Sequence, residues 1–218
     1  MGKLAFALLL VITPSMAQET GWETITEKDG IIVQQKEVPG RSLPVFRGEA
    51  VIDTNVFEIL GILQDIERNP EWMHACMDAR RIKKLNHKEY IAYNRSDAPW
   101  PISDRDVVVH AKAKIDRASG ELSIHMRSID MPEFAQDEGA VRMPRLNGHY
   151  RFKELGPRKT WIEYEIDADP GGSIPGWLVR LASRDIPFIT LQNLRKRVKV
   201  TEEQGTYASY IKSIEHLK

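Results

Sequence analysis

Residues 106–116 read Asp-Val-Val-Val-His-Ala-Lys-Ala-Lys-Ile-Asp and carry the clearest structural pattern in the 218-residue chain. Polar side chains at 110, 112, 114 and 116 alternate with apolar ones at Val107, Val109, Ala111, Ala113 and Ile115. Five apolar residues at every second position predict a β-strand that has one apolar face and one face exposed to solvent. Such strands are typical of an antiparallel sheet, so we expect another layer to cover the apolar face.

Other stretches extend this sheet. Residues 122–126 and 162–168 show the same alternation, and Arg-Ala-Ser-Gly at 117–120 predicts the turn after the first strand. Residues 31–38 and 44–53 are rich in β-forming side chains, and Pro-Gly-Arg-Ser at 39–42 joins them. This arrangement predicts a hairpin near the start of the domain.

Two helical segments are expected between that hairpin and the strand at 106–116. Asp53, Thr54 and Asn55 offer N-terminal caps to residues 56–63, whose apolar side chains recur at spacings of three and four. We expect a second short helix after Asn69-Pro70, carrying Trp72 and Cys76.

The last third of the chain predicts a long helix that covers the sheet. Ser173 and Pro175 favour its start, and Pro187 is expected to kink it. The basic run at 195–197 is interpreted as its solvated end. The apolar stripe consists of Trp177, Leu178, Leu181, Phe188, Ile189 and Leu194.

Composition narrows the class of partner. The chain has 31 basic and 31 acidic residues, which gives a formal net charge of zero. Nucleic-acid binding and polybasic attachment to anionic lipid both depend on a local excess of Lys and Arg, so neither is expected. The single cysteine, Cys76, excludes a disulfide within the chain. A chain of this length buries roughly 70% of its unfolded surface, which is enough for a core without a structural metal.

The N-terminal residues 1–17 predict a secretory signal peptide. A positive start at Lys3 precedes nine uninterrupted apolar residues at 4–12, and small residues end the segment at Ala17. Nine residues are too few to span a bilayer, which requires about 20. An apolar N-terminal strand or buried helix is the alternative. We therefore expect a single domain at 18–218 that is exported, to the periplasm in a Gram-negative source and otherwise into the medium.

The order of these elements and four motifs resemble the START family of lipid-transfer domains, which is related to the steroidogenic acute regulatory protein. The motifs are Asp65 with Arg68 and Trp72, Pro-Ile-Ser-Asp-Arg-Asp at 101–106, Gly-His-Tyr-Arg-Phe at 148–152, and Asp-Pro-Gly-Gly-Ser-Ile-Pro-Gly-Trp at 169–177. The resemblance implies an α+β helix-grip fold, in which a curved antiparallel sheet packs on a long C-terminal helix. It also implies an internal apolar tunnel that holds one lipid or other apolar molecule.

The resemblance suggests which residues line that tunnel and close it. Small side chains on the strand at 106–116 leave room for a ligand, although large residues of the final helix are an alternative filling. In the family, the loop before this strand and the final helix form a lid. The lid residues would be Trp100, Pro101 and Ile102, which either touch a bilayer or pack on the final helix. The cavity residues would be Tyr93, Val107, Val109, Ala111, Met126, Tyr164, Trp177, Leu181 and Phe188.

Arg105 and Asp106 are interpreted as a structural pair that fixes the loop through bidentate hydrogen bonds, with direct ligand contact as the alternative. The sterol-handling members of the family carry a charged pair in the tunnel strands. Alignment through Arg105 places Ala111 and residues 91–93 at those positions, and none of these residues is charged. The charged pair is therefore absent, and a sterol is not the expected ligand. The alternation places His110 on the outward face.

The sequence favours a carrier over an enzyme. No Gly-x-Ser-x-Gly motif occurs, the six histidines lack metal-binding spacing, and Cys76 is read as a small buried hydrophobe. We therefore expect no catalytic residue, metal or cofactor. The predicted function is that of a monomer that carries a lipid or other apolar molecule between membranes through transient membrane contact. The alternatives are a polyketide cyclase-like enzyme and a ligand-free protein-interaction module.

Overall fold

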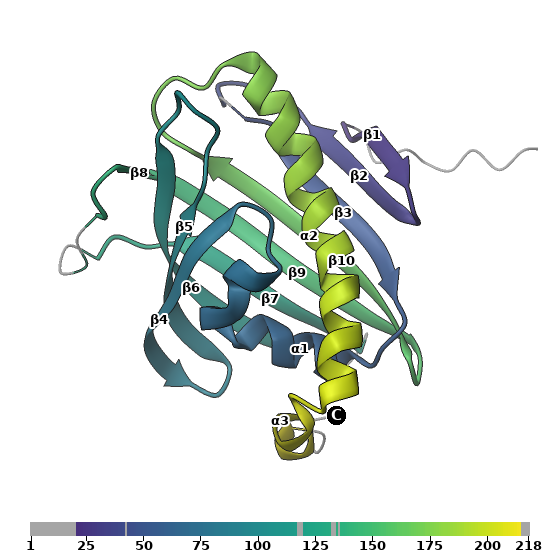
Figure 1. The fold of residues 1–218 in the computed structure, drawn as a ribbon. Helices are drawn as coiled ribbons and strands as arrows, with labels where there is room; N and C mark the ends of the chain where they lie inside the picture. The colour runs from purple at the N-terminus through teal and green to yellow at the C-terminus, as the bar shows by residue number, and fades with distance from the viewer. Residues whose placement is uncertain (1–20, 42, 117–119, 132–133, 135, 215–218) are drawn as a thin grey trace, which may run out of the picture.

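The structure is a computed structural model that describes residues 21–41, 43–116, 120–131, 134 and 136–214. Within these residues, ten strands form one curved sheet in the order β1-β2-β3-β10-β9-β7-β6-β5-β4, with β8 beside β6 (Figure 1). Neighbouring strands are antiparallel except for β8, which runs parallel to β6. The strands are β1 (Glu23–Lys28), β2 (Ile31–Lys36), β3 (Val45–Ile52), β4 (Cys76–Asn86), β5 (Glu89–Ser96), β6 (Asp104–Asp116), β7 (Glu121–Ser128), β8 (Ala140–Arg142), β9 (Arg145–Gly156) and β10 (Lys159–Asp169).

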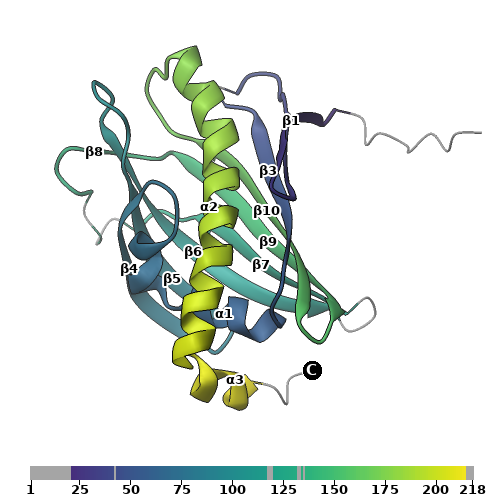
Figure 2. The ribbon, with the colours of Figure 1, turned by 45° about the vertical axis from the view of Figure 1, so that its right-hand side comes forward.

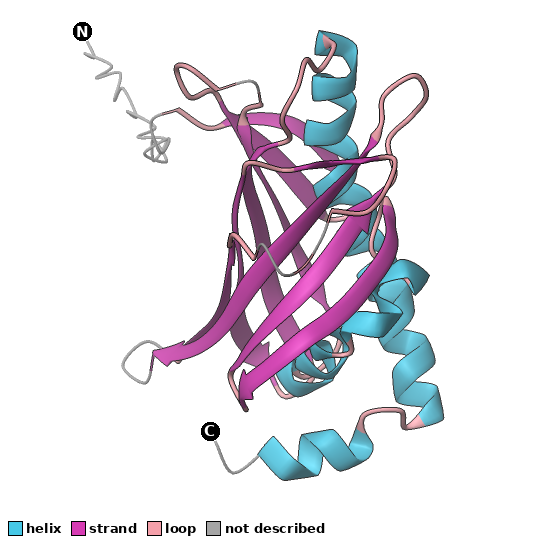
Figure 3. Ribbon diagram, turned by 90° about the vertical axis from the view of Figure 1, so that its left-hand side faces the viewer, coloured by secondary structure: helices cyan, strands magenta, loops and turns pink. Residues whose placement is uncertain are grey.

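One face of the sheet is covered by helices. The long helix α2 (Gly176–Gln204) crosses the concave face, and α1 (Val56–Gln64) lies at one end of it (Figure 2). The remaining helices are the short 3-10 helix η1 (Ile66–Glu71) and α3 (Ala208–Ile214). The side view in Figure 3 shows the strands curling around the helical layer. This architecture confirms the predicted α+β helix-grip fold.

The predicted strand at 106–116 is the greater part of β6. Its apolar face is directed at the helical layer, and Ala111 is almost fully buried there. The predicted turn after it lies, at residues 117–119, outside the described residues. The predicted hairpin is confirmed, since β2 pairs with β3 in antiparallel register. The predicted cap is also present, because Asn55 Oδ1 accepts a hydrogen bond from the Glu58 amide at 3.0 Å.

The expected second helix carrying Cys76 is wrong. The chain forms only η1, which contains Pro70, and Cys76 begins strand β4. Proline lacks an amide hydrogen and disfavours helical geometry in the residue before it, which keeps this helix short. Ala75 then adopts a left-handed conformation, with φ of 58°, and turns the chain into the strand. Three register shifts interrupt the pairing of β4 with β5 and break the alternation that would have revealed the strand.

Helix α2 approaches the sheet closely at Gly48 in β3. A Cβ atom on Gly48 would lie 2.8 Å from Cβ of Pro187 and 2.9 Å from Cδ1 of Leu191. The absence of a side chain at Gly48 therefore lets the helix rest on the strand. The helix does not end at Pro187, and the kink expected there stays a prediction.

The basic run at 195–197 is not the solvated end of the helix, because α2 continues to Gln204. The Arg195 guanidinium donates to the carbonyl oxygens of Gly30 and Val51, at 2.9 and 3.0 Å. Arg197 donates to Glu71 at 2.6 Å. These two arginines link α2 to the turn between β1 and β2, to the end of β3, and to η1.

Candidate functional site

A cavity of about 260 Å³ lies between the concave face of the sheet and α2. Its walls are mostly apolar, and they come from α1, η1 and α2, from strands β3, β4, β5, β6, β7, β9 and β10, and from the loops between them. Six residues expected from the sequence line it: Tyr93, Val107, Val109, Ala111, Met126 and Tyr164. All of them except Tyr93 stand on strands whose alternation is visible in the sequence.

The expected helix residues are not at the cavity wall. Trp177 and Leu181 are 47% and 36% exposed, and Phe188 packs elsewhere against the core. The side chains of α2 that line the cavity are instead Leu178, Ala182 and Ile186. These positions are four residues apart and so share one face of the helix. The apolar stripe in the sequence is broad, and it did not indicate which side of it faces the sheet.

Tyr93 borders the cavity, but its hydroxyl lies on the opposite face of the sheet. It is paired with Val108, whereas the cavity-facing residues of β6 are the neighbours of Val108. The Tyr93 hydroxyl donates to Asp137 Oδ2 at 2.6 Å, and the Arg80 guanidinium lies 4.4 Å from the ring centre. Tyr93 was expected as a polar contact for the ligand, and the sequence of β5 has no clear alternation that would indicate which face its side chain takes.

Two further tyrosines that the sequence did not single out, Tyr90 and Tyr150, line the cavity. Tyr150 on β9 is paired with Tyr164 on β10, and their rings stack 4.5 Å apart at an angle of 9°. The Tyr150 hydroxyl is buried and has no hydrogen-bond partner among the described residues. The signal was present in the Gly-His-Tyr-Arg-Phe motif, where Tyr150 and Phe152 share the inward face.

Burial controls the acidity of the polar groups in the cavity. It raises the pKa of Tyr90 to about 12 and the pKa of Tyr150 well above the usual range for a tyrosine. It also raises the pKa of the Cys76 thiol to about 11, although the hydrogen bond from Asn94 opposes this. A thiol that stays protonated at neutral pH is a poor nucleophile. Cys76 therefore behaves as the small buried hydrophobe expected, although on a strand and not on a helix.

The predicted lid loop lies at the mouth of the cavity. Pro99 and Ile102 contribute to the wall, and the Ile102 amide donates to the Pro99 carbonyl at 3.1 Å. Trp100, in contrast, is 90% exposed and does not pack on α2. Asp104 anchors the loop, because it binds the Arg95 guanidinium at 2.7 Å and accepts from the Ala98 amide at 3.3 Å.

Arg105 and Asp106 do not pair with each other, because adjacent residues of a strand point to opposite faces. Arg105 lines the cavity mouth and donates to the carbonyls of Pro170 and Gly171, both at 3.1 Å, in the turn before α2. Asp106 faces outward and accepts from Arg142 at 2.8 and 3.0 Å. Burial acts to raise the pKa of Asp106, but the hydrogen bonds from Arg142 outweigh it, and the pKa lies below its usual value. The expected pair of Arg105 with Asp106 is therefore wrong, and the bidentate pair joins Asp106 of β6 to Arg142 of β8.

A second cavity, of about 1100 Å³, adjoins the first at the opposite end of the sheet. Both are lined by Leu63, Tyr90 and Ile124, which places them next to each other. Tyr210 and Ile214 of α3 form part of its wall. Basic side chains gather at this end: Arg81, Lys84, His87 and Lys88.

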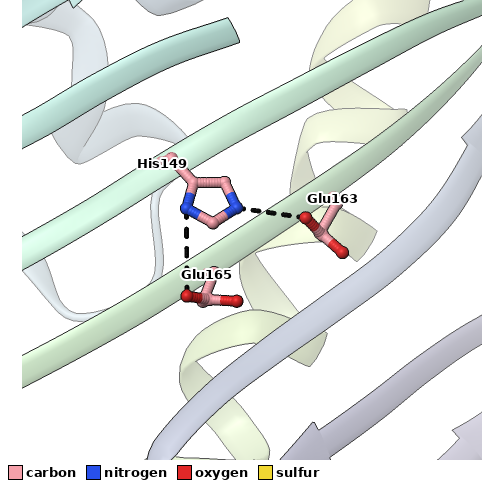
Figure 4. Close-up of side chains that lie close together, drawn as sticks. All are labelled: His149, Glu163 and Glu165. Atoms are coloured by element: carbon pink, nitrogen blue, oxygen red, sulfur yellow. Dashed lines mark hydrogen bonds and ion pairs between the residues drawn. The ribbon is translucent and has the colours of Figure 1, made fainter. Parts of the chain in front are cut away.

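The outward face of the sheet carries a group of potential metal ligands (Figure 4). His149 Nε2 lies 3.0 Å from Glu163, and its Nδ1 lies 3.9 Å from Glu165. Glu163 also binds Arg151 at 3.1 Å and Arg47 at 3.5 Å. Two guanidinium groups on one carboxylate oppose a metal cation there, and the two imidazole nitrogens point to different carboxylates. The cluster is therefore an ion-pair network on the wet face.

Helix α2 is the longest helix of the structure, and its exposed side is strongly charged. None of the helices in the described ranges is long and apolar enough to cross a membrane.

Comparisons with known proteins agree with this geometry. The model of the START domain family matches residues 10–214. An uncharacterized protein of Pseudomonas aeruginosa is 30% identical over 192 residues, which cover 88% of this chain and 93% of that protein. The rat phosphatidylcholine transfer protein is 20% identical over 171 residues, covering 75% of this chain and 77% of that protein.

Solved structures show the same fold. The STAR-related lipid transfer protein of Xanthomonas axonopodis superimposes with a TM-score of 0.74 and 28% identity, covering 82% of this chain and 99% of that chain. The Zhui aromatase/cyclase of Streptomyces sp. R1128 superimposes with a TM-score of 0.50 and 9% identity, covering 72% of this chain and 94% of that chain, which shows a likeness of fold alone. The match to the family model spans most of the chain, and with the grip of the sheet on α2 it shows that the protein belongs to the START domain family.

Proposed function

We propose that the protein binds one lipid or other apolar molecule between the sheet and α2 and carries it between membranes. The observation that carries this proposal is the apolar cavity, whose wall on β6 is built from side chains as small as Ala111. Small side chains leave room that α2 does not fill. The names of the lipid transfer proteins among its relatives support the same function.

Burial of apolar ligand surface would supply the affinity. At about 25 cal/mol per Å², each 100 Å² removed from water contributes about 2.5 kcal/mol. The first cavity alone is small for a lipid with long chains, but the second cavity adjoins it. A ligand that extends from the Ile102 end to the α3 end would use both.

Membrane contact is proposed for the mouth of the first cavity. Trp100 is almost fully exposed, and Trp177 at the start of α2 is half exposed. Ile102, two residues after Trp100, and Leu178, directly after Trp177, both line the cavity, so each tryptophan is close in sequence to the cavity wall. Tryptophan favours the boundary between water and lipid. We infer that these side chains touch a bilayer transiently while a ligand is exchanged, and that the protein does so as an exported monomer.

A catalytic role is less well supported by the cavity. An acid–base catalyst needs a group whose pKa is near the working pH and whose position is fixed by a partner. Burial moves the pKa values of Cys76 and Tyr90 away from neutrality. His74 also borders the cavity, but in the described part of the chain its ring has no carboxylate within hydrogen-bond distance. We therefore infer that the protein is a carrier without catalytic activity.

The function is tested by transfer between vesicles. Donor vesicles containing a fluorescent phospholipid and a quencher are mixed with unlabelled acceptor vesicles, and the protein is added in catalytic amounts. The proposal predicts a rise in fluorescence that increases with protein concentration. A protein that stays folded but leaves the transfer rate at its spontaneous value would contradict it, and would favour an interaction module. Chemical conversion of an added polycyclic substrate would favour the cyclase.

A further inference from the structure

We propose that Tyr150 and Tyr164 together bind an uncharged oxygen of the ligand, such as an acyl ester carbonyl, deep in the first cavity. This inference rests on the proposed function and adds a polar specificity site to it. It would make the protein select lipids that carry a hydrogen-bond acceptor at that depth over hydrocarbon of the same length.

The first observation is the unsatisfied hydroxyl of Tyr150. It is buried and has no hydrogen-bond partner among the described residues. Nearly all buried polar groups in proteins are hydrogen-bonded, because leaving one unpaired costs about 1–3 kcal/mol. The cavity wall in front of it is apolar, so a ligand atom is the natural partner.

The second observation is the geometry of the two rings. Tyr150 and Tyr164 stand directly opposite each other on neighbouring strands, and both line the cavity. Their rings are nearly parallel, with centres 4.5 Å apart. After burial, the interaction with the neighbouring Tyr164 hydroxyl is what raises the pKa of Tyr150. The Tyr150 hydroxyl nevertheless makes no hydrogen bond of normal distance and angle among the described residues. A carbonyl oxygen has two lone pairs, so one oxygen placed between the hydroxyls accepts from both.

The charge around the site selects an uncharged acceptor. Among the described residues that line this cavity, Arg105 is the one with a permanent positive charge. Tyr150 is paired with Ile124 on β7, and Ile124 is paired with Ala113 on β6. Ala113 lies eight residues along β6 from Arg105, which corresponds to about 27 Å. The groups that raise the pKa of Tyr150 besides its burial are Tyr164, Tyr90 and Cys76. An anionic phosphate at Tyr150 would be buried without a counter-ion, which is costly.

Depth distinguishes this site from the mouth. Tyr150 lies near the junction of the two cavities, since Ile124, its partner on β7, lines both. A ligand held there by a carbonyl would direct apolar chains toward the mouth at Ile102 or into the second cavity. The polar contact would then fix how far the ligand enters.

The test compares two lipids that differ only in the carbonyl oxygens. Delipidated protein is incubated with vesicles of dioleoyl phosphatidylcholine mixed equally with its dioleyl ether analogue, re-isolated, and its bound lipid quantified by mass spectrometry. We expect about a tenfold preference of the wild type for the ester, which is what one or two neutral hydrogen bonds provide. Tyr150→Phe should reduce this preference to less than threefold.

Two controls keep the test decisive. Tyr207→Phe also removes a tyrosine hydroxyl, but this hydroxyl donates to Asp65 at 3.0 Å outside the cavity, so the ester preference should persist. Tyr150→Phe in the empty protein should unfold at the same or a higher urea concentration than wild type, because an unpaired buried hydroxyl is removed.

Equal loading of ester and ether lipid by the wild type would overturn the inference alone. Loading of neither lipid by any of the proteins would contradict the proposed carrier function and the inference with it.

Discussion

Gly48 of β3 lies directly against Pro187 of α2, at a separation that leaves no room for a side chain on the strand. This contact sets the distance between the long helix and β3. Leu191 takes part in the same close approach, and Leu194 is the next buried apolar residue along the helix. The cavity therefore exists because the helix is held close at Gly48 and stands over small side chains elsewhere.

Gly48→Ala should lower the free energy of unfolding by about 1–3 kcal/mol, since the added methyl group meets the rigid proline ring at 2.8 Å. Urea unfolding followed by circular dichroism measures the change. Gly156→Ala is the matched control, because nothing lies within 4 Å of the added atom there. Equal stability of the Gly48→Ala protein and wild type would show that α2 does not depend on this close contact.

Asp106→Asn should destabilise the protein by about 3–5 kcal/mol, because it leaves the Arg142 guanidinium facing a buried neutral group. The pKa of Asp106 is lower in the folded protein than its usual value near 3.9. Its contribution to stability is therefore present above that value and is lost as the pH falls through the folded pKa.

Unfolding midpoints at pH 7 and at acid pH test this prediction, with Asp78→Asn as a control. Asp78 pairs with Arg80 at 3.0 Å on the exposed surface, where an ion pair contributes about 0–1 kcal/mol. A loss at Asp106 no greater than at Asp78 would contradict the structural role of the β6–β8 pair.

Glu58 should have the opposite pH dependence. Burial raises its pKa, although the Thr201 hydroxyl donates to its Oε1 at 2.6 Å. A raised folded pKa means that this group stabilises the fold most below its unfolded pKa, and that the contribution is lost as the pH rises through the folded pKa. Glu58→Gln should flatten the stability profile between pH 4 and 7. A profile identical to that of wild type, measured by urea midpoints across this range, would refute the assignment.

Trp100→Ala combined with Ile102→Ser should slow lipid exchange between vesicles several-fold while leaving the unfolding midpoint nearly unchanged. Trp100 is almost fully exposed, so it contributes little to the core. Leu155→Ala removes a half-exposed apolar side chain at the end of β9, and its exchange rate should match wild type. Equal rates for all three proteins would exclude the loop as the membrane contact.

Much of the fold could be predicted from periodicity, because strands with one wet face repeat every two residues. β6 and β10 were expected for this reason. The hairpin of β2 and β3 was expected from its β-forming side chains and from the turn residues between them. β4 was missed because its bulges interrupt the alternation. The position of Cys76 was misjudged for a related reason: a short apolar cluster after Pro70 fits a helix or a strand equally well.

The cavity residues that stand on strands could be predicted from the sequence. Those on α2 were missed, because they depend on how the helix is rotated about its axis. Val107, Val109 and Ala111 follow from alternation alone. The choice between Trp177 and Leu178 depends on which side of a broad apolar stripe meets the sheet, and tertiary packing decides that. The unpaired hydroxyl of Tyr150 has no signature in sequence, because it is defined by what surrounds it in space.

The central claim is that the space over Ala111 holds a ligand, and native mass spectrometry of Ala111→Leu measures this most directly. Wild-type protein incubated with phospholipid vesicles should carry one lipid per chain, and Ala111→Leu should carry much less, because the larger side chain enters the cavity. Lys114→Leu places the same side chain on the wet face of the same strand and should load like wild type. Full loading of Ala111→Leu, or no lipid on folded wild-type protein, would contradict the account.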